Sequence, residues 1–178
     1  MFTAVDHKIL RSIQAWRRPW LSKVFVGLTY TGTGKAWIVW VVILNALDQM
    51  GVTFVRFQGR FLKALFCALL AWGVGYLLKR YFSRPRPSTA ILDFELVVPP
   101  PACGSFPSSH TGASMAFFAG LLMLAHPDAW IVGIWATLVS FSRLYLGVHY
   151  PSDVAGGLAV GFGSAFVVVV ILSLNGFV

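Results

Sequence analysis

The chain has 178 residues, of which 57% are hydrophobic and only 11% are charged, and its mean hydropathy is +0.75. Soluble domains carry about 25% charged residues, so this composition excludes an ordinary water-soluble globule. It predicts an all-α polytopic membrane protein with one domain over residues 1–178. The formal net charge of +8 favours an anionic lipid or substrate over nucleic acid, because a membrane-embedded chain has little room for a broad basic face.

In chain order, the first predicted element is an amphipathic helix over residues 3–18, of the kind that lies in the headgroup region of a membrane. Its apolar face carries Val5, Ile9, Ile13 and Trp16. Residues 20–50 form either one span or a hairpin of two short ones. We favour the hairpin, with its turn at residues 32–34, because a single span would place Lys35 near the bilayer centre at a cost of about 2.5–3.5 kcal/mol.

Four longer apolar segments complete a prediction of about six transmembrane helices. They cover residues 61–78, 108–125, 129–146 and 154–174. Lys and Arg divide evenly between the two sides of the predicted membrane span. Most of those on one side belong to the polar cluster described below, which leaves little positive charge there to set the orientation. We therefore expect both termini in the cytoplasm and the active loops facing the periplasm or cell exterior. The membrane we expect is a bacterial cytoplasmic membrane.

Two of these segments carry small residues at a spacing of four, which is typical of close helix packing in membranes. The first set is Gly112, Ala116 and Gly120, and the second is Ala155, Ala159 and Gly163. We expect both faces to pack against neighbouring helices.

Polar residues gather at the ends of the spans, in three stretches. Residues 79–87 end the third predicted span, residues 107–110 begin the fourth, and residues 142–153 link the fifth to the sixth. Spans three and five must end on the side of the membrane where spans four and six begin. The topology therefore predicts that the three stretches meet at one site.

The residue types in these stretches point to an anion, and in particular to phosphate. Lys79, Arg86 and Arg143 would repel one another at a shared site unless an anion lay between them. The helix that begins near Ser108 offers unpaired backbone N–H groups at its positive end. The Ser108 hydroxyl can either cap that helix or donate to a bound oxygen.

Two histidines add the groups needed for phosphoryl transfer. Asp153, in the first turn after Pro151, can reach back to His149, fix its tautomer and leave the other ring nitrogen as a nucleophile. His110 is placed to protonate a leaving oxygen. The only other carboxylates of this region are Asp93 and Glu95. These are too few for a two-metal centre, so we expect no metal and no cofactor.

Taken together, the motifs resemble those of the type-2 phosphatidic acid phosphatase superfamily, which includes the vanadium haloperoxidases. Its signature is KxxxxxxRP, PSGH and SRxxxxxHxxxD. The chain has Lys79-(six)-Arg86-Pro87, Pro107-Ser108-Ser109-His110 and Ser142-Arg143-(five)-His149-(three)-Asp153. The spacing selects Arg86 over Arg84. The resemblance implies phosphate binding by Lys79, Arg86, Arg143, Ser108 and the backbone N–H of Ser109, a phosphohistidine on His149, orientation by Asp153 and general acid catalysis by His110.

The resemblance implies an integral membrane lipid phosphatase that acts without a metal. Candidate substrates are undecaprenyl diphosphate, phosphatidylglycerophosphate, phosphatidic acid and lipid A 1-phosphate. Ser109 stands where the family has Gly, which adds a Cβ but keeps the N–H. Two alternatives remain open: a lipid phosphotransferase that uses the same site, and a non-enzymatic lipid-binding or transport protein, which would need polar residues within its spans.

Overall fold

The structure is a computed structural model that describes residues 3–50, 59–91, 96–99, 103–127 and 129–177, and within these ranges it is helical without strands. The helices are α1 (Thr3–Gln14), α2 (Pro19–Thr31), α3 (Gly34–Gln49), α4 (Arg60–Phe82), α5 (Pro87–Ala90), α6 (Ser109–Met123), α7 (Ala129–Tyr145) and α8 (Pro151–Leu174). The prediction of an all-α fold is therefore confirmed for the described part of the chain.

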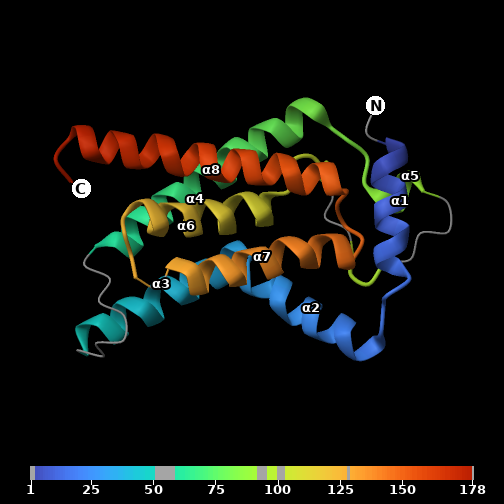
Figure 1. Ribbon diagram of the computed structural model, residues 1–178, viewed down its shortest axis with the longest axis horizontal. Coiled ribbons are helices and arrows are strands. Elements are labelled where there is room, and N and C mark those ends of the chain that lie inside the picture. The colour runs from blue at the N-terminus through green and yellow to red at the C-terminus, as the bar shows by residue number, and fades with distance from the viewer. Residues whose placement is uncertain (1–2, 51–58, 92–95, 100–102, 128, 178) are drawn as a thin grey trace.

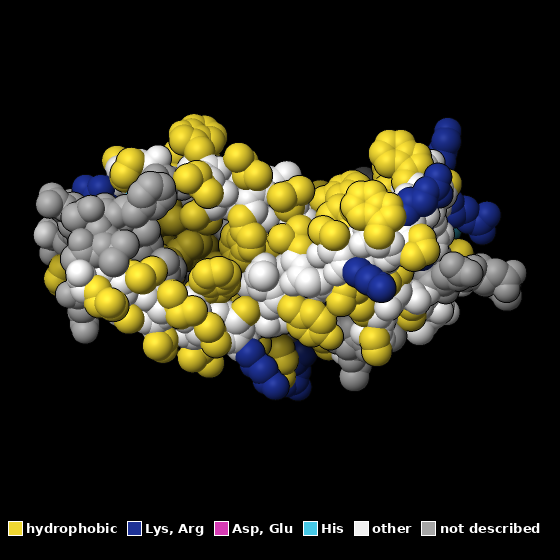
Figure 2. All heavy atoms as spheres, turned by 90° about the horizontal axis from the view of Figure 1, so that it is seen from below, with side chains coloured by type: hydrophobic (Ala, Val, Ile, Leu, Met, Phe, Trp, Pro, Cys, Tyr) yellow, Lys and Arg dark blue, Asp and Glu magenta, His cyan; other side chains and the backbone are white. Residues whose placement is uncertain are grey.

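The helices α4, α6, α7 and α8 run along the long axis of the molecule and correspond to the last four predicted spans (Figure 1). Helix α6 packs against the other three, and its residues Thr111–Phe117 and Ala119–Leu121 are buried. The segment Arg60–Ala90, which contains α4, and helix α8 are long and apolar enough to cross a membrane, whereas α7 is apolar but shorter. Apolar side chains are spread along the whole face seen in Figure 2, whereas the Lys and Arg side chains visible there form a few separate groups.

Glycines set the close contact of α8 with α6. A Cβ on Gly157 would lie 2.7 Å from the Ser108 carbonyl oxygen, and one on Gly161 would lie 2.8 Å from the Gly112 carbonyl oxygen. The predicted face of Ala155, Ala159 and Gly163 is wrong, because all three residues are exposed. On α6, by contrast, the predicted small-residue face does pack, since a Cβ on Gly120 would lie 2.9 Å from Cys67 Sγ of α4.

The predicted hairpin over residues 20–50 is not what the structure shows. The chain does turn at Gly32, but α2 and α3 point away from each other from that turn (Figure 1). The turn is held against the middle of α7, where Trp135 Nε1 donates to Thr31 Oγ1 at 2.8 Å. A Cβ on Gly32 would lie 2.9 Å from a methyl carbon of Val139. Helices α2 and α3 together therefore make one pass along the long axis.

Helix α1 lies at the opposite end of the molecule from where the sequence analysis places it. It crosses the end at which α7 stops and α8 begins, while the C-terminal end of α8 lies at the far end (Figure 1). Asp6 of α1 forms an ion pair, with 2.8 Å between the charged atoms, with Arg84 in the segment that follows α4. The expectation that both termini lie opposite the active loops is therefore wrong for the N-terminal helix, whose side is set by this long-range contact.

Candidate active site

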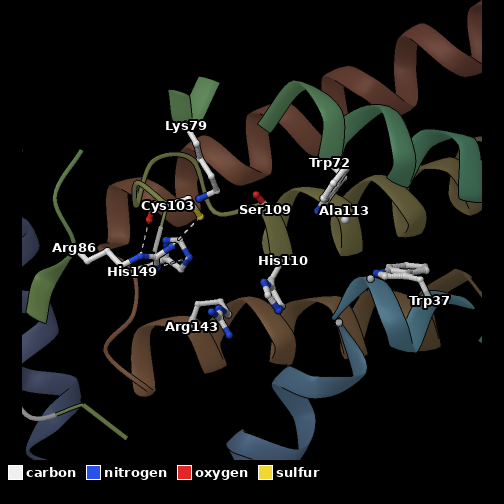
Figure 3. A pocket seen from close by; sticks show the side chains of 12 residues that line it. Trp37, Trp72, Lys79, Arg86, Cys103, Ser109, His110, Ala113, Arg143 and His149 are labelled. Atoms are coloured by element: carbon white, nitrogen blue, oxygen red, sulfur yellow. Dashed lines mark hydrogen bonds between the residues drawn. The ribbon is translucent and has the colours of Figure 1, made fainter. Parts of the chain in front are cut away.

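A cavity of about 190 Å³ opens where α4, α6 and α7 meet the loop before α8 (Figure 3). Six of the residues singled out by the sequence line it: Lys79, Arg86, Ser109, His110, Arg143 and His149. The rest of the wall includes apolar side chains, among them Trp37, Trp72 and Ala113. The predicted convergence of the three polar stretches is thus seen in the structure, with a charged end and an apolar end to one cavity.

Backbone carbonyl groups hold two of the three cations. Lys79 Nζ donates to the carbonyl oxygens of Gly104 at 3.1 Å and Ser105 at 3.2 Å. Arg86 donates from Nε to Cys103 O at 3.0 Å, from Nη1 to Val148 O at 2.8 Å, and from Nη2 to Gly104 O at 3.2 Å. The segment that begins at Cys103 therefore fixes the direction of both side chains without neutralising their charge.

Arg143, near the end of α7, is the third cation. Its Nη1 donates to the hydroxyl oxygen of Thr29 from α2. Its Nε is buried and has no hydrogen-bond partner among the described residues. This side chain therefore keeps an unused donor within the wall of the cavity.

The cavity carries an excess of positive charge. Lys79, Arg86 and Arg143 are 6%, 5% and 4% exposed, so little water reaches them. Within the described ranges, none of the three forms an ion pair with a carboxylate, since Asp6 and Asp153 pair with Arg84 instead. Buried charges are costly unless they are compensated. The geometry therefore favours a bound anion with more than one negative charge.

His149 lies beside these cations, on the loop that joins α7 to α8. Its Nε2 is 3.5 Å from Arg86 Nη1, and its Nδ1 is 3.4 Å from Asp153 Oδ2, which is longer than a normal hydrogen bond. Burial, and then the positive charges of Arg143, Lys79 and Arg86, hold the pKa of His149 well below its usual value. The imidazole is therefore neutral at neutral pH, which leaves one ring nitrogen with a free electron pair.

Asp153 takes its position from the start of α8. Pro151 is the first residue of this helix, and the Tyr150 N–H donates to Asp153 Oδ2 at 2.9 Å while the Asp153 N–H donates to the Tyr150 carbonyl oxygen at 3.0 Å. This reciprocal pair fixes the carboxylate on the side of the loop that carries His149. The other carboxylate oxygen, Oδ1, accepts from Arg84 Nη1 at 2.6 Å.

The start of α6 carries the remaining predicted residues. Ser108 is fully buried and is not part of the cavity wall. Its hydroxyl oxygen accepts from the Thr111 N–H at 3.5 Å and from Thr111 Oγ1 at 3.1 Å, so it caps the helix, which is the first of the two roles predicted for it. Ser109 and His110 do line the cavity, and His110 lies near Arg143 in Figure 3.

Sequence reasoning did not find three polar residues at this end of the molecule: Asp6, Thr29 and Arg84. Burial is the largest single influence on Arg84 and opposes its charge, but the hydrogen bonds and negative charges of Asp6 and Asp153 together raise its pKa above the usual value. The only sequence signal for Arg84 was its place in Arg84-Pro-Arg86-Pro87, and the motif spacing set it aside. Asp93 and Glu95, considered as metal ligands, lie outside the described residues.

The fold is that of a transmembrane phosphatase of known structure. The crystal structure of a transmembrane PAP2 type phosphatidylglycerolphosphate phosphatase from Bacillus subtilis superimposes with a TM-score of 0.75. The two chains are 29% identical, and the match covers 95% of this chain and 85% of that one. The likeness therefore extends to both fold and sequence.

Residues 60–177 match the PAP2 superfamily, and the chain belongs to that family. Phosphatidylglycerophosphatase B of Bacillus subtilis (strain 168) is 30% identical over 182 residues, which cover 93% of this chain and 82% of that protein. Undecaprenyl-diphosphatase BcrC of the same organism is 32% identical over 128 residues, which cover 72% of this chain and 65% of that protein. The resemblance drawn from the three motifs is thus confirmed.

Proposed function

We propose that this chain is a membrane lipid phosphatase that removes the terminal phosphate of a lipid phosphomonoester or diphosphate. The observation that carries this proposal is a set of three buried cations, Lys79, Arg86 and Arg143, around the neutral imidazole of His149. Among the described residues, none of the three has a carboxylate partner. A phosphate dianion supplies the charge that this cavity lacks. The named PAP2 relatives are phosphatases, which supports the same reaction class.

The proposed reaction has two steps. In the first, the Nε2 electron pair of His149 forms a bond to phosphorus, the bond from phosphorus to the lipid oxygen breaks, and His110 gives a proton to that oxygen. In the second, His110 takes a proton from water, the water oxygen bonds to phosphorus, and the nitrogen–phosphorus bond breaks. The cations stabilise charge on the phosphoryl oxygens throughout. Asp153 retains its place beside Nδ1 and stabilises the charged imidazole; the 3.4 Å separation is expected to shorten when substrate binds.

The size of the cavity supports a headgroup as the bound part of the substrate. At about 190 Å³ it is smaller than the roughly 300–1,000 Å³ of pockets that enclose a whole small molecule. Its apolar end, with Trp37 and Trp72, lies between helices whose outer faces are apolar. We therefore propose that the phosphate occupies the charged end while the lipid chain extends past the tryptophans into the membrane.

A phosphate-release assay on purified protein in detergent tests this function. The panel contains phosphatidylglycerophosphate, undecaprenyl diphosphate, phosphatidic acid and lipid A 1-phosphate, each with and without EDTA. We expect release of inorganic phosphate from at least one lipid at a rate that EDTA does not change. Transfer of the phosphoryl group to an added lipid acceptor would instead indicate a phosphotransferase. Absence of both activities would contradict the proposal.

We further propose that the two termini lie on opposite sides of the membrane, with the site and α1 on the outer side. From the site end, the chain runs along the long axis through α2 with α3 and then through α4, α6, α7 and α8 in alternating directions. It finishes at the far end. Reporters fused at residue 1 and after residue 178 test this arrangement. The C-terminal reporter should be cytoplasmic and the N-terminal one external. Two reporters on the same side would restore the six-span interpretation.

A further inference from the structure

Arg84 connects the start of α8 to the N-terminal helix. Its Nη1 donates to Asp153 Oδ1 at 2.6 Å and to Ser152 Oγ at 2.7 Å, and its Nη2 donates to Asp6 Oδ2 at 2.8 Å. Its guanidinium carbon lies 4.2 Å from the centre of the Tyr150 ring. Contacts with two helices and an aromatic ring fix this planar group in one orientation.

These contacts determine which oxygen of Asp153 faces His149. Asp153 is fully buried, so the orientation of its carboxylate depends on protein partners. Arg84 holds Oδ1, while Oδ2 accepts from the Tyr150 N–H and lies 3.4 Å from His149 Nδ1. Without Arg84, Oδ1 would lose its charged partner, and the carboxylate could turn to seek another. The imidazole would then lose the group that orients it.

Asp6 in turn holds Arg84 from the side of α1. Its Oδ2 accepts from Arg84 Nη2 and, at 2.5 Å, from the hydroxyl of Ser152, and its Oδ1 accepts from the Ser152 N–H at 3.0 Å. That N–H belongs to the first turn of α8 and has no partner within the helix. Asp6 is buried, and the neighbouring His7 stacks on Tyr150 with 5.7 Å between ring centres. Helix α1 thus contributes a buried carboxylate to the catalytic end.

We propose that Arg84 is a positioning residue for the His149–Asp153 pair and that Asp6 of α1 keeps Arg84 in place. This inference rests on the proposed function, since the pair needs orientation only if His149 attacks phosphorus. Neither Arg84 nor Asp6 lines the cavity, so both act through Asp153 and not on the bound phosphate.

The two roles predict a particular pattern of kinetic change. Arg84→Gln should lower kcat by about 10- to 100-fold, as expected when a reacting group is misaligned. KM and the inhibition constant of orthovanadate should stay within about threefold, because the three cations of the cavity are unchanged. Arg84→Lys keeps the charge and should restore part of kcat. Asp6→Asn should lower kcat less than Arg84→Gln, and the double variant should be no slower than Arg84→Gln alone.

The control is Arg80→Gln, which removes the same charge from an exposed position in the last turn of α4. Each variant is purified in detergent, its Tm is recorded, and it is assayed on the panel lipid that the wild type hydrolyses fastest. A value of kcat for Arg84→Gln within twofold of Arg80→Gln would overturn the positioning role. So would a rise in KM and in the vanadate constant at unchanged kcat, which would indicate direct phosphate binding.

Two further outcomes separate this inference from the proposed function. If Arg84→Gln does not fold, the positioning role is tested with Arg84→Lys and Asp6→Asn. A kcat equal to that of the wild type in both variants would overturn it. Additive losses in the Arg84→Gln, Asp6→Asn double variant would overturn the claim that Asp6 acts through Arg84. An inactive wild type would overturn both proposals, whereas an active wild type with an unaffected Arg84→Gln variant would overturn only this one.

Discussion

The half of the molecule built from α4, α6, α7 and α8 differs in packing from the N-terminal half built from α1, α2 and α3. Helix α6 is buried along most of its length and meets α8 through Gly157 and Gly161. Helix α3, by contrast, leaves Ile38 69% exposed and Val42 63% exposed. Close packing of these four helices fixes the charged end of the cavity, whereas the N-terminal half adds Gly32, Gly34 and Trp37 to its wall. Positions in the two halves should therefore respond differently to substitution.

The largest expected effect comes from the nucleophile itself. His149→Ala should lower kcat by at least about 10³-fold, because it removes the imidazole that the proposed reaction uses as its nucleophile. The protein should still fold, and trapping with a radiolabelled lipid phosphate should give a labelled enzyme in the wild type only. Near-normal turnover in this variant would contradict the assignment of His149.

A glycine in each half tests the difference in packing directly. Gly157→Ala places a Cβ 2.7 Å from the Ser108 carbonyl oxygen and 2.8 Å from Thr111 Cβ, and should destabilise the protein by about 1–3 kcal/mol. That loss corresponds to a fall in Tm of several degrees, at about 2–4 °C per kcal/mol for a chain of this size. Gly27→Ala in α2 meets nothing within 4 Å and should leave Tm unchanged or slightly higher. Thermal unfolding in detergent measures both, and equal shifts would contradict the comparison.

The contribution of α2 to the site should be smaller. Thr29→Val keeps the size of the side chain but removes the hydroxyl that accepts from Arg143 Nη1. An unpaired donor costs about 1–3 kcal/mol, part of which a bound phosphate recovers. We expect a rise in KM of about tenfold or less, with kcat little changed. Steady-state kinetics decide, and a loss of kcat at unchanged KM would mean that Thr29 affects the chemical step.

The smallest expected effect is a shift in the pH at which kcat/KM falls on the acid side. The pKa of His149 lies well below 6.5, so the imidazole stays neutral, and the enzyme active, as pH falls through 6.5. Activity should be lost only at a lower pH, where His149 takes up a proton. Removing a positive charge by Lys79→Gln should raise that pKa and move the acid limb to higher pH. Dividing the kcat/KM profile of Lys79→Gln by that of the wild type cancels the ionisation of the substrate. An acid limb at the same pH in both proteins would contradict the claim that Lys79 lowers the pKa of His149.

The same division separates what the sequence predicts well from what it predicts poorly. The helices over 61–78, 108–125, 129–146 and 154–174 appear close to their predicted ends as α4, α6, α7 and α8. The shared site followed from alternation of direction along these helices, which needs no knowledge of packing. The short spacings between polar residues at the helix ends then indicated the individual site residues.

The N-terminal half could not be placed in the same way. Its Lys and Arg residues balance those of the other side and so say little about its place in the membrane, whereas the structure fixes α1 through the buried pair of Asp6 and Arg84, 78 positions apart in the chain. The turn at Gly32 was found, but its position against Val139 of α7 was not, because no local pattern encodes which helix a turn meets. Thr29 carries no motif at all, and only its contact with Arg143 shows its place in the site.

The position of Asp6 has a practical consequence for handling the protein. Asp6 lies in the first turn of α1, so an affinity tag or fluorescent domain joined directly ahead of this helix would emerge next to the carboxylate that holds Arg84. Helix α8 ends at Leu174, at the other end of the molecule from α1 (Figure 1). Purification handles intended to leave turnover intact therefore belong after residue 178.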